Sequence, residues 1–289
     1  MNRINGLSMI IPCFNESLSV KKTLKDLHES LISLGLDFEI IVVDDHSTDE
    51  SSEKVKELKL KELVLLRNDF NLGYGASIKE GIKNSRFNWI GICDADGTYP
   101  ADRIPEMAEF FKDFDMVIGV RTGDIKAVPL IRRPAKWFLN KFSSFLLQKE
   151  IRDVNSGFRF FRKDIILKFW NIFPSGFSFS TTSTMLFSME NLRIKNISID
   201  YFKRKGKSKI RPIKDTYNFF LLILRITMLF NPLRIFIPTF FFTFSLSLVS
   251  FGRDIYLKNL TDTSVLLFVF SLIIFLIGLL ADLINRREN

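Results

Sequence analysis

Short apolar runs alternate with longer amphipathic stretches through the first part of the chain. Four runs have the length and composition of buried strands: residues 8–12, 38–43, 63–66 and 89–93. After the first run, apolar residues recur every three or four positions, which is the spacing of one helical face: Val20, Leu24, Leu27, Leu31 and Leu34. Strands and helices alternating in this way predict an α/β fold with a Rossmann-like, mostly parallel sheet and helices on both faces.

The same pattern continues to about residue 201. It predicts a strand over 116–120, a helix over 129–147, a helix over about 181–192 and a last strand over 194–201. A basic block follows, because seven of the twelve residues from Lys203 to Lys214 are Lys or Arg and none is acidic. A cationic block before an apolar tail indicates anionic lipid headgroups or phosphates as its partner, rather than nucleic acid.

The tail after residue 215 is apolar enough to enter a membrane. Residues 217–230 carry Arg225 as their one charge and predict an amphipathic interface helix, which Asn231-Pro232 ends. Two apolar runs follow, 235–251 with 17 residues and 264–284 with 21, and a membrane span needs about 20 residues with roughly 17 as the lower limit. We therefore expect a catalytic domain over 1–214, an interface helix over 215–232 and a transmembrane hairpin over 233–289.

The charges around the hairpin predict its orientation. The loop between the two apolar runs has two basic and two acidic residues, whereas the outer flanks are basic: Arg225, Arg234, Arg286 and Arg287. Positive residues stay on the cytoplasmic side, so we expect an integral membrane protein with its catalytic domain on the cytoplasmic face. The alternative is a pair of core helices in a larger soluble domain.

The composition limits the cellular compartment and the kinds of metal or disulfide chemistry that the chain can support. The chain has 289 residues, 31 of them Phe, and a formal net charge of +9. Its two cysteines, Cys13 and Cys93, lie in apolar runs, which argues against a disulfide scaffold and fits a reducing compartment. Two histidines are too few for a histidine-based zinc site. The apolar run 9–11 is too short for a signal peptide, so none is expected.

The fourth strand-like run ends in two acids one residue apart, Asp94 and Asp96, followed by a Gly-Thr-Tyr-Pro turn. Side chains two apart along a strand point the same way, and ligands of open α/β sheets bind at the carboxyl ends of strands. Two carboxylates there suit Mg²⁺ or Mn²⁺ carrying a phosphorylated substrate, because these ions take only part of their shell from protein. The alternative is a helix N-cap with a spare acid.

These acids belong to a series of six motifs. Four of them are Pro12-x-x-Asn15-Glu16, Val43-Asp44-Asp45-x-Ser47-x-Asp49, Asn71-x-Gly73-x-Gly75 and Asp94-x-Asp96. Two more are Asp153-x-x-Ser156-Gly157-Phe158-Arg159 and Arg204-x-Gly206-x-Ser208-Lys209. In this order they resemble glycosyltransferase family 2, inverting enzymes of GT-A fold, and the last two are similar to the polyprenyl-phosphate branch that includes dolichol-phosphate mannose and glucose synthases. The resemblance covers about residues 7–235.

The resemblance implies a nucleotide-sugar site in the loops after the strands. It assigns binding of a UDP- or GDP-sugar to Pro12, Asn15, Glu16, Asp44, Asp45, Gly73, Gly75, Asp94 and Ala95. Asp44 would accept hydrogen bonds from base or ribose, the two glycines would let the backbone approach the nucleotide, and Asp94 and Asp96 would hold Mg²⁺ or Mn²⁺. Thr98 stands where many dolichol-phosphate mannose synthases have Gln, which leaves a third side-chain ligand, and mannose as the sugar, open.

The resemblance also implies a site for the leaving diphosphate or the lipid phosphate. Its candidates are basic and hydroxyl residues: Arg121, Arg133, Ser156, Arg159, Arg204, Lys207, Ser208 and Lys209. Arginine suits this role because its guanidinium binds phosphate through two parallel hydrogen bonds. A plain surface charge is the alternative for Arg133. The expected catalytic residues are Asp94, Asp96, Arg121 and Asp153, the last of which would orient acceptor or sugar, or only cap its loop.

The implied activity is inverting, metal-dependent transfer of a sugar to a polyprenyl phosphate, undecaprenyl or dolichyl. A phosphate monoester has a second pKa near ~6 and is largely ionised at neutral pH, so a strong general base is unnecessary. Expected partners are the nucleotide-sugar, the lipid phosphate and the membrane. Nucleic acid is not expected, and a homo-oligomer is left open.

Two other functions fit parts of the sequence. Asp94-Ala-Asp96-Gly97-Thr98 also matches the nucleophile loop of haloacid-dehalogenase-type phosphatases, although that loop follows the opening strand in those enzymes and three strand–helix units precede it here. A non-catalytic membrane scaffold that binds nucleotide-sugar is the third possibility, against which the intact acid pair argues. Processive polysaccharide synthases carry Gln-x-x-Arg-Trp, and none of the three tryptophans lies in that motif.

Overall fold

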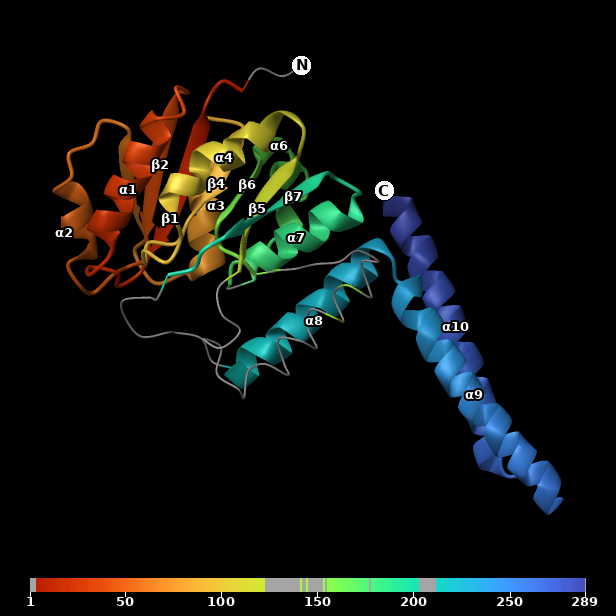
Figure 1. Cartoon of the computed structure of the whole chain (residues 1–289). Helices are drawn as coiled ribbons and strands as arrows, with labels where there is room; N and C mark the ends of the chain where they lie inside the picture. The colour runs from red at the N-terminus through yellow and green to blue at the C-terminus, as the bar shows by residue number, and fades with distance from the viewer. Residues whose placement is uncertain are drawn as a thin grey trace. The chain divides into compact units, whose positions relative to one another are not determined.

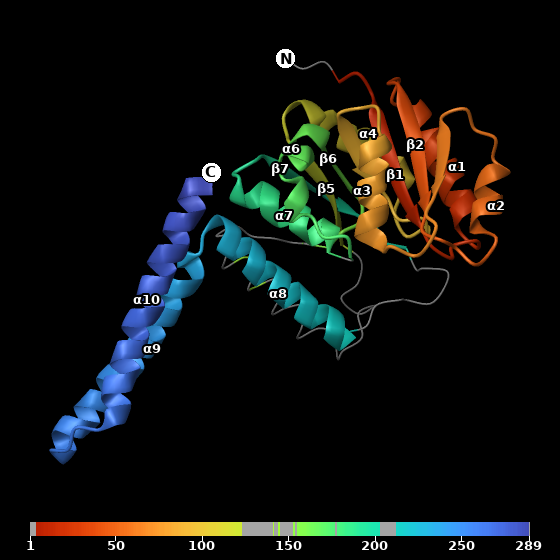
Figure 2. The same cartoon turned by 180° about the vertical axis from the view of Figure 1, so that it is seen from behind.

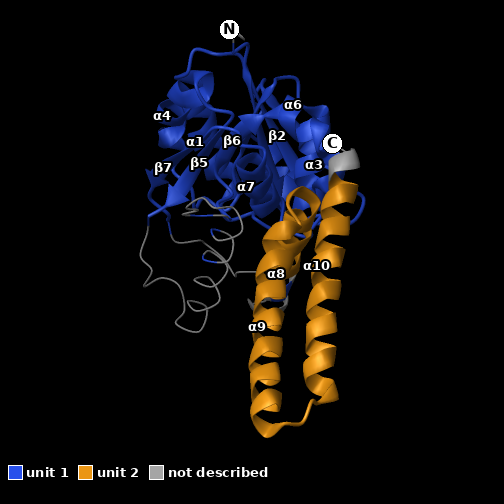
Figure 3. Cartoon of the chain, turned by 90° about the vertical axis from the view of Figure 1, so that its right-hand side faces the viewer, with its two compact units in different colours: residues 1–219 blue, residues 220–289 orange. Residues whose placement is uncertain are grey.

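The computed structural model describes residues 4–122, 141, 144, 153, 155–176, 178–202 and 212–288. By its contacts the chain divides into two units, Met1–Phe219 and Phe220–Asn289 (Figure 3). The division falls inside one helix, α8 (Pro212–Phe230). Of the helix expected over 129–147 the structure describes Lys141 and Ser144, and both are helical.

The first unit is built on a seven-stranded sheet in the order β3-β2-β1-β4-β6-β5-β7. The strands are β1 (Leu7–Cys13), β2 (Phe38–Asp44), β3 (Leu63–Arg67), β4 (Trp89–Ile92), β5 (Met116–Arg121), β6 (Arg159–Arg162) and β7 (Ile194–Ile199). β6 runs antiparallel to both of its neighbours, β4 and β5, and the other pairs are parallel. The predicted α/β fold with a mostly parallel sheet is therefore confirmed.

Helices cover both faces of this sheet (Figures 1 and 2). One face carries α1 (Val20–Ile32), α2 (Ser51–Lys56) and α4 (Ile104–Ala108), and the other carries α3 (Tyr74–Asn84), α6 (Lys163–Lys168) and α7 (Phe179–Met189). Short 3₁₀ turns flank α4 at Ala101–Arg103 and Glu109–Lys112, and another follows α6 at Trp170–Ile172. Because both faces are covered, the central strands are apolar throughout rather than alternating.

The packing of α1 shows how the leucine pattern forms the core. Leu24, Leu27 and Leu31 are fully buried and join a cluster with Met9 and Ile11 of β1. On the opposite face α3 lies directly on β1, because a Cβ at Gly81 would be 2.5 Å from the Ile10 Cγ2 atom. Only a residue without a side chain allows this approach, so the register of α3 on β1, and with it the start of α3, is fixed.

The second unit contains a helical hairpin. Its helices, α9 (Leu233–Leu257) and α10 (Asp262–Glu288), pack along each other. Both are long and apolar enough to cross a membrane by length and composition. They are longer than the predicted runs 235–251 and 264–284, because polar residues extend each helix beyond its apolar stretch. The helix expected over 217–230 forms the larger part of α8.

A polar turn closes the hairpin. Asp254 is buried, and one of its carboxylate oxygens accepts hydrogen bonds from the Thr261 backbone N–H at 2.8 Å, the Thr261 hydroxyl at 2.7 Å and the Ser264 hydroxyl at 2.6 Å. Ser264 also pairs with Ser250 at 2.6 Å across the two helices. The acid thus caps the start of α10 from within α9, which joins the two helices at this end.

The core of the first unit provides a stability prediction. Leu27→Ala removes a fully buried side chain of α1 and should lower the free energy of unfolding by about 2–5 kcal/mol, the usual cost of a large cavity. Ile32→Ala in the same helix removes a side chain that is 58% exposed and should change it by less than about 0.5 kcal/mol. Denaturant titration of both variants measures the difference, and equal losses would contradict this packing of α1.

Candidate functional site

A pocket of about 370 Å³ opens at the carboxyl edge of the sheet. It is lined by residues that follow β1, β2 and β4, by the start of α3, by the turn before β6 and by the ends of β5 and β7. This is the edge where ligands bind in open α/β sheets. Pro12, Glu16, Asp45, Gly73, Asp94, Ala95, Asp96 and Arg121, all predicted from the sequence, line this pocket.

Asp94 lies between a tyrosine and a glycine. The Tyr74 hydroxyl donates to its Oδ1 at 3.0 Å. On the other side the backbone of Gly157 is so close that a Cβ there would be 2.7 Å from Asp94 Oδ2. The carboxylate is therefore held in place by side chain and backbone from two other segments of the chain.

Asp96 is held by its own turn. Its Oδ1 accepts from the Thr98 backbone N–H at 3.1 Å and from the Thr98 hydroxyl at 2.6 Å. Thr98 is fully buried and does not line the pocket. In this structure Thr98 thus orients an acid and does not face the pocket. Among the described residues no three His, Cys, Asp or Glu side chains form a metal-binding group.

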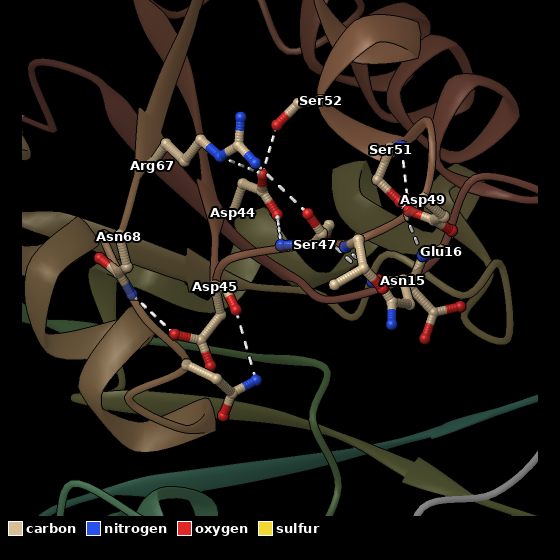
Figure 4. Close-up of polar contacts among 12 residues, drawn as sticks. Asn15, Glu16, Asp44, Asp45, Ser47, Asp49, Ser51, Ser52, Arg67 and Asn68 are labelled. Atoms are coloured by element: carbon tan, nitrogen blue, oxygen red, sulfur yellow. Dashed lines mark hydrogen bonds and ion pairs between the residues drawn. The ribbon is translucent and has the colours of Figure 1, made fainter.

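Asp44 and Asn15 are not among the residues that line the pocket, and Figure 4 shows the polar contacts that they make. Asp44 is 1% exposed, accepts hydrogen bonds from Ser47 N–H at 3.0 Å and from the Ser52 hydroxyl, and has Arg67 Nε at 3.5 Å. Asn15 accepts from Thr48 N–H at 2.8 Å. The Asp44 carboxylate thus binds the loop that follows its own strand, and its contact with base or ribose stays a prediction.

Asp45 joins two loops while facing the pocket. It accepts hydrogen bonds from the Asn68 amide at 2.8 Å, from Leu72 N–H at 2.9 Å and from Gly73 N–H at 2.8 Å. The loop after β2 is thereby joined to the loop that leads into α3. This carboxylate sets the position of the α3 N-terminus on the pocket rim.

The two glycines of the third motif have different roles. Gly73 lines the pocket with φ +97°, a conformation that favours glycine. Gly75 lies outside the pocket wall, and a Cβ there would be 2.4 Å from the Gly176 carbonyl oxygen. Gly75 N–H donates to that oxygen at 3.0 Å, and Ala76 N–H donates to Ser175 O at 2.8 Å. The close approach expected at Gly75 is therefore made by the chain's own 174–176 segment and not by a nucleotide.

Arg121 and Asp153 form a bidentate ion pair beside the pocket. Arg121 Nε lies 2.7 Å from Asp153 Oδ2 and Nη2 lies 2.8 Å from Oδ1, and the guanidinium lies 5.3 Å from the centre of the Tyr201 ring. Burial opposes the positive charge, but the hydrogen bonds and charge of Asp153 outweigh it and raise the pKa of Arg121. The sequence predicted both residues, and the structure brings them together as one unit.

Arg159 corrects a prediction. Its side chain is fully buried and does not line the pocket. The guanidinium donates to Ser156 O at 2.9 Å. It also donates to three oxygens of α7: Ser180 O at 2.6 Å, Ser183 Oγ at 2.7 Å and Thr184 Oγ1 at 2.9 Å. Burial lowers the pKa of Arg159 to about 10, so it stays charged at neutral pH. A phosphate has no access to this group, which instead fastens the turn before β6 to α7.

Ser156 also departs from its predicted role. Its hydroxyl is buried and donates to Gly119 O at 2.6 Å, inside the sheet. It therefore shapes the turn that presents Gly157 to Asp94. The remaining predicted phosphate ligands lie outside the described residues: Arg133, Arg204, Lys207, Ser208 and Lys209.

Three tyrosines of the pocket wall were not predicted: Tyr74, Tyr99 and Tyr201. Tyr99 accepts a hydrogen bond from Gly157 N–H at 2.8 Å, and its ring lies edge-on to Tyr201 with centroids 5.5 Å apart. Burial and the neighbouring Asp94 raise the pKa of both Tyr74 and Tyr99, so both phenols stay neutral. The available signal was the position of Tyr74 inside the third motif and of Tyr99 in the turn just after the fourth.

The comparisons with known proteins agree with this fold. Residues 8–170 match the model of glycosyl transferase family 2, and residues 231–286 match that of the GtrB C-terminal hairpin. The chain belongs to glycosyl transferase family 2. This match assigns the Asp94-Ala-Asp96 loop to a glycosyltransferase and leaves the phosphatase alternative without support.

Two curated relatives are from archaea. The dolichol-phosphate mannosyltransferase of Pyrococcus furiosus is 30% identical over 167 residues, which cover 55% of this chain and 47% of that protein. The low-salt glycan biosynthesis hexosyltransferase Agl6 of Haloferax volcanii is 25% identical over 218 residues, covering 72% of this chain and 51% of that one. The chain thus spans about half the length of each of these two relatives.

A solved structure shows the same fold at low identity. The glucosyl-3-phosphoglycerate synthase of Mycobacterium tuberculosis, in complex with Mn²⁺, UDP-glucose and phosphoglyceric acid, superposes with a TM-score of 0.59 at 13% identity. The similarity covers 77% of this chain and 80% of that one. The predicted GT-A fold is therefore confirmed for the first unit.

The contact between Gly157 and Asp94 leads to a prediction. Gly157→Ala places a methyl group 2.7 Å from Asp94 Oδ2 and must displace the acid, so sugar transfer should fall about 100-fold, as for a misplacement of about 1 Å. Gly176→Ala is the matched control, because a Cβ there meets nothing within 4 Å. Transfer rates and thermal unfolding of both variants provide the measurement. An active Gly157→Ala variant would contradict this geometry of the acid.

Proposed function

We propose that this protein transfers a sugar from a nucleotide-diphosphate sugar to a polyprenyl phosphate, with inversion and with a divalent metal ion. The observation that carries the proposal is the pair Asp94 and Asp96 on the wall of a pocket at the carboxyl edge of a family 2 fold. The names of relatives support the acceptor, since one of them is a dolichol-phosphate mannosyltransferase. The hairpin match supports a membrane-bound substrate.

The donor set fits a hard cation. Asp94 and Asp96 line the pocket, and among the described residues no histidine, cysteine or further acid joins them to form a metal-binding group of three. Mg²⁺ and Mn²⁺ accept such partial oxygen coordination, because phosphate oxygens and water complete their shell. When bound, the ion would neutralise charge on the diphosphate. Asp94 and Asp96 would hold it, each fixed by its own hydrogen-bond partner, Tyr74 for Asp94 and Thr98 for Asp96.

The chemical step needs little from a base. An ionised oxygen of the lipid phosphate attacks the anomeric carbon, the bond from that carbon to the diphosphate breaks, and the nucleoside diphosphate leaves with the electron pair. Among the described residues that line the pocket, Arg121 is the cation that can stabilise the negative charge on the phosphates during the transfer. Because both carboxylate oxygens of Asp153 bind Arg121, we assign Asp153 to orienting the guanidinium rather than to accepting a proton. Catalysis rests on positioning and charge neutralisation.

The first test is an assay of membranes containing the full chain with a panel of labelled UDP- and GDP-sugars. We expect label in the organic phase with one or more donors, loss of the product with EDTA, and recovery with Mn²⁺ or Mg²⁺. Asp94→Asn and Asp96→Asn should each lower transfer by at least about 100-fold, the scale of lost electrostatic stabilisation at a reacting phosphate.

Asp113→Asn is the matched control, because Asp113 is exposed at the end of a 3₁₀ turn and lies outside the pocket. NMR of the lipid product gives the anomeric configuration and tests inversion. Lipid product that forms equally well in EDTA would contradict the metal, and no lipid product from any donor would contradict the acceptor.

We also propose that the hairpin spans the membrane with the first unit on the cytoplasmic side. The basic flanks of the hairpin and the neutral loop between its helices support this orientation. The three parts of this arrangement are the cytoplasmic domain 1–214, the interface helix 215–232 and the hairpin 233–289.

Cysteine labelling tests the orientation. Both native cysteines are buried, and burial raises the pKa of Cys13 to about 12 and that of Cys93 well above its usual value, so neither should react. Lys258→Cys in the hairpin loop should be labelled by a charged maleimide in intact cells. Lys56→Cys, exposed on the first unit, should be labelled only after permeabilisation. The reverse pattern would contradict the orientation.

A further inference from the structure

Tyr74 lies at the junction of the pocket with the buried scaffold behind it. It is the first residue of α3, between the two glycines of the third motif, and its side chain lines the pocket. Its hydroxyl donates to Asp94 Oδ1 at 3.0 Å, so the proton points at the acid and the phenol oxygen is the donor. The neutral phenol therefore orients the carboxylate and does not replace it as a ligand.

The backbone on both sides of Tyr74 is fixed. Gly73 N–H donates to Asp45 Oδ2 at 2.8 Å, Gly75 N–H donates to Gly176 O at 3.0 Å, and Ala76 N–H donates to Ser175 O at 2.8 Å. Three of the four backbone N–H groups from Gly73 to Ala76 are thus bound to other segments. The backbone that carries the ring is therefore fixed. The hydrogen bond from the hydroxyl to Asp94 then costs little additional conformational entropy.

The opposite side of Asp94 is closed by the Gly157 backbone. A Cβ there would be 2.7 Å from Oδ2 and 3.0 Å from Oδ1 of the acid, so the carboxylate cannot rotate towards that turn. Gly157 is itself held by the hydrogen bond to Tyr99 and by the Arg159 contacts of the preceding Ser156. With that side of the carboxylate closed, the hydrogen bond from Tyr74 to Oδ1 contributes to fixing which edge of the carboxylate faces the pocket.

We propose that Tyr74 is a positioning residue that sets the orientation of Asp94 for the divalent ion. This rests on the proposed function, because it assumes that Asp94 is a metal ligand. Partners that orient a ligand typically change metal affinity by about 10- to 100-fold when they are removed. Tyr74 touches the ion only through the acid, so its loss should weaken metal binding while leaving the site able to work at high metal concentration.

The test compares Tyr74→Phe with the unaltered full chain in detergent or membranes. Tyr74→Phe keeps the ring and removes the donor. We expect the half-saturating Mn²⁺ concentration for sugar transfer to rise about tenfold, with transfer largely recovered at saturating Mn²⁺. Independently of turnover, an electron paramagnetic resonance titration of Mn²⁺ in the presence of UDP or GDP should show the same shift in affinity.

Ser85→Ala is the matched control. It removes a buried hydroxyl from the other end of α3, where Ser85 Oγ donates to Ile82 O at 2.6 Å, and it should leave Mn²⁺ binding unchanged. Thermal unfolding of both variants confirms that each is folded. Equal Mn²⁺ affinity of Tyr74→Phe and the unaltered chain would overturn the inference, as would a loss of transfer that saturating Mn²⁺ does not restore.

The binding titration separates this inference from the proposed function. If Asp94→Asn loses Mn²⁺ binding and Tyr74→Phe binds normally, the metal site stands and the role of Tyr74 is wrong. If the unaltered chain binds no Mn²⁺ with either nucleotide, the proposed metal dependence itself is wrong, and the inference falls with it.

Discussion

The contact between the Gly157 backbone and the Asp94 carboxylate is the constraint on which the pocket depends. One partner ends a strand in the parallel part of the sheet, and the other precedes the antiparallel strand beside it. Their approach leaves no room for a Cβ, so the acid is confined on one side by main chain. The other features of the site, including the three pocket tyrosines and the Arg121–Asp153 ion pair, are arranged around this fixed carboxylate.

Two arginines that look alike in the sequence have separate physical roles. Arg121 forms an ion pair with Asp153 at the pocket wall, where a phosphate can approach. Arg159 is surrounded by neutral oxygens of Ser and Thr and by main-chain carbonyls, deep between β6 and α7. A buried cation is costly unless its donors are satisfied, and the Ser- and Thr-rich start of α7 provides the acceptors. Ser180, Ser183 and Thr184 of α7 therefore satisfy the donors of Arg159.

The fold was largely predictable because its signals are local and repeated. The leucines of α1 and the unbroken apolar strands specify a sheet covered on both faces, and the tail specifies its two long helices. The acid pair was predictable as well, as two carboxylates that follow a buried strand, although β4 ends at Ile92 and both acids lie in the loop and turn after it. What the sequence does not show is which polar groups are already occupied.

Asp44, Gly75 and Arg159 illustrate this limit. Each lies in a motif of a nucleotide-sugar enzyme, and each contacts the protein's own chain in this structure. Each has a partner far away in the sequence: Ser52 is 8 residues from Asp44, Thr184 is 25 from Arg159 and Gly176 is 101 from Gly75. No periodicity encodes such pairings, so motif residues divide into ligand contacts and supports only once the tertiary structure is known.

The strand order has a consequence for how the protein is made. β6 lies between β4 and β5, and among the described strands β5 pairs only with β6 and β7, both of which come later in the chain. During synthesis β5 must wait without a hydrogen-bonded neighbour until the ribosome has delivered at least Arg162. The first four strands can assemble before that moment, but the nascent protein then has an unpaired edge at β4. Asp94 gains its contact with the Gly157 backbone only when β6 pairs with that edge.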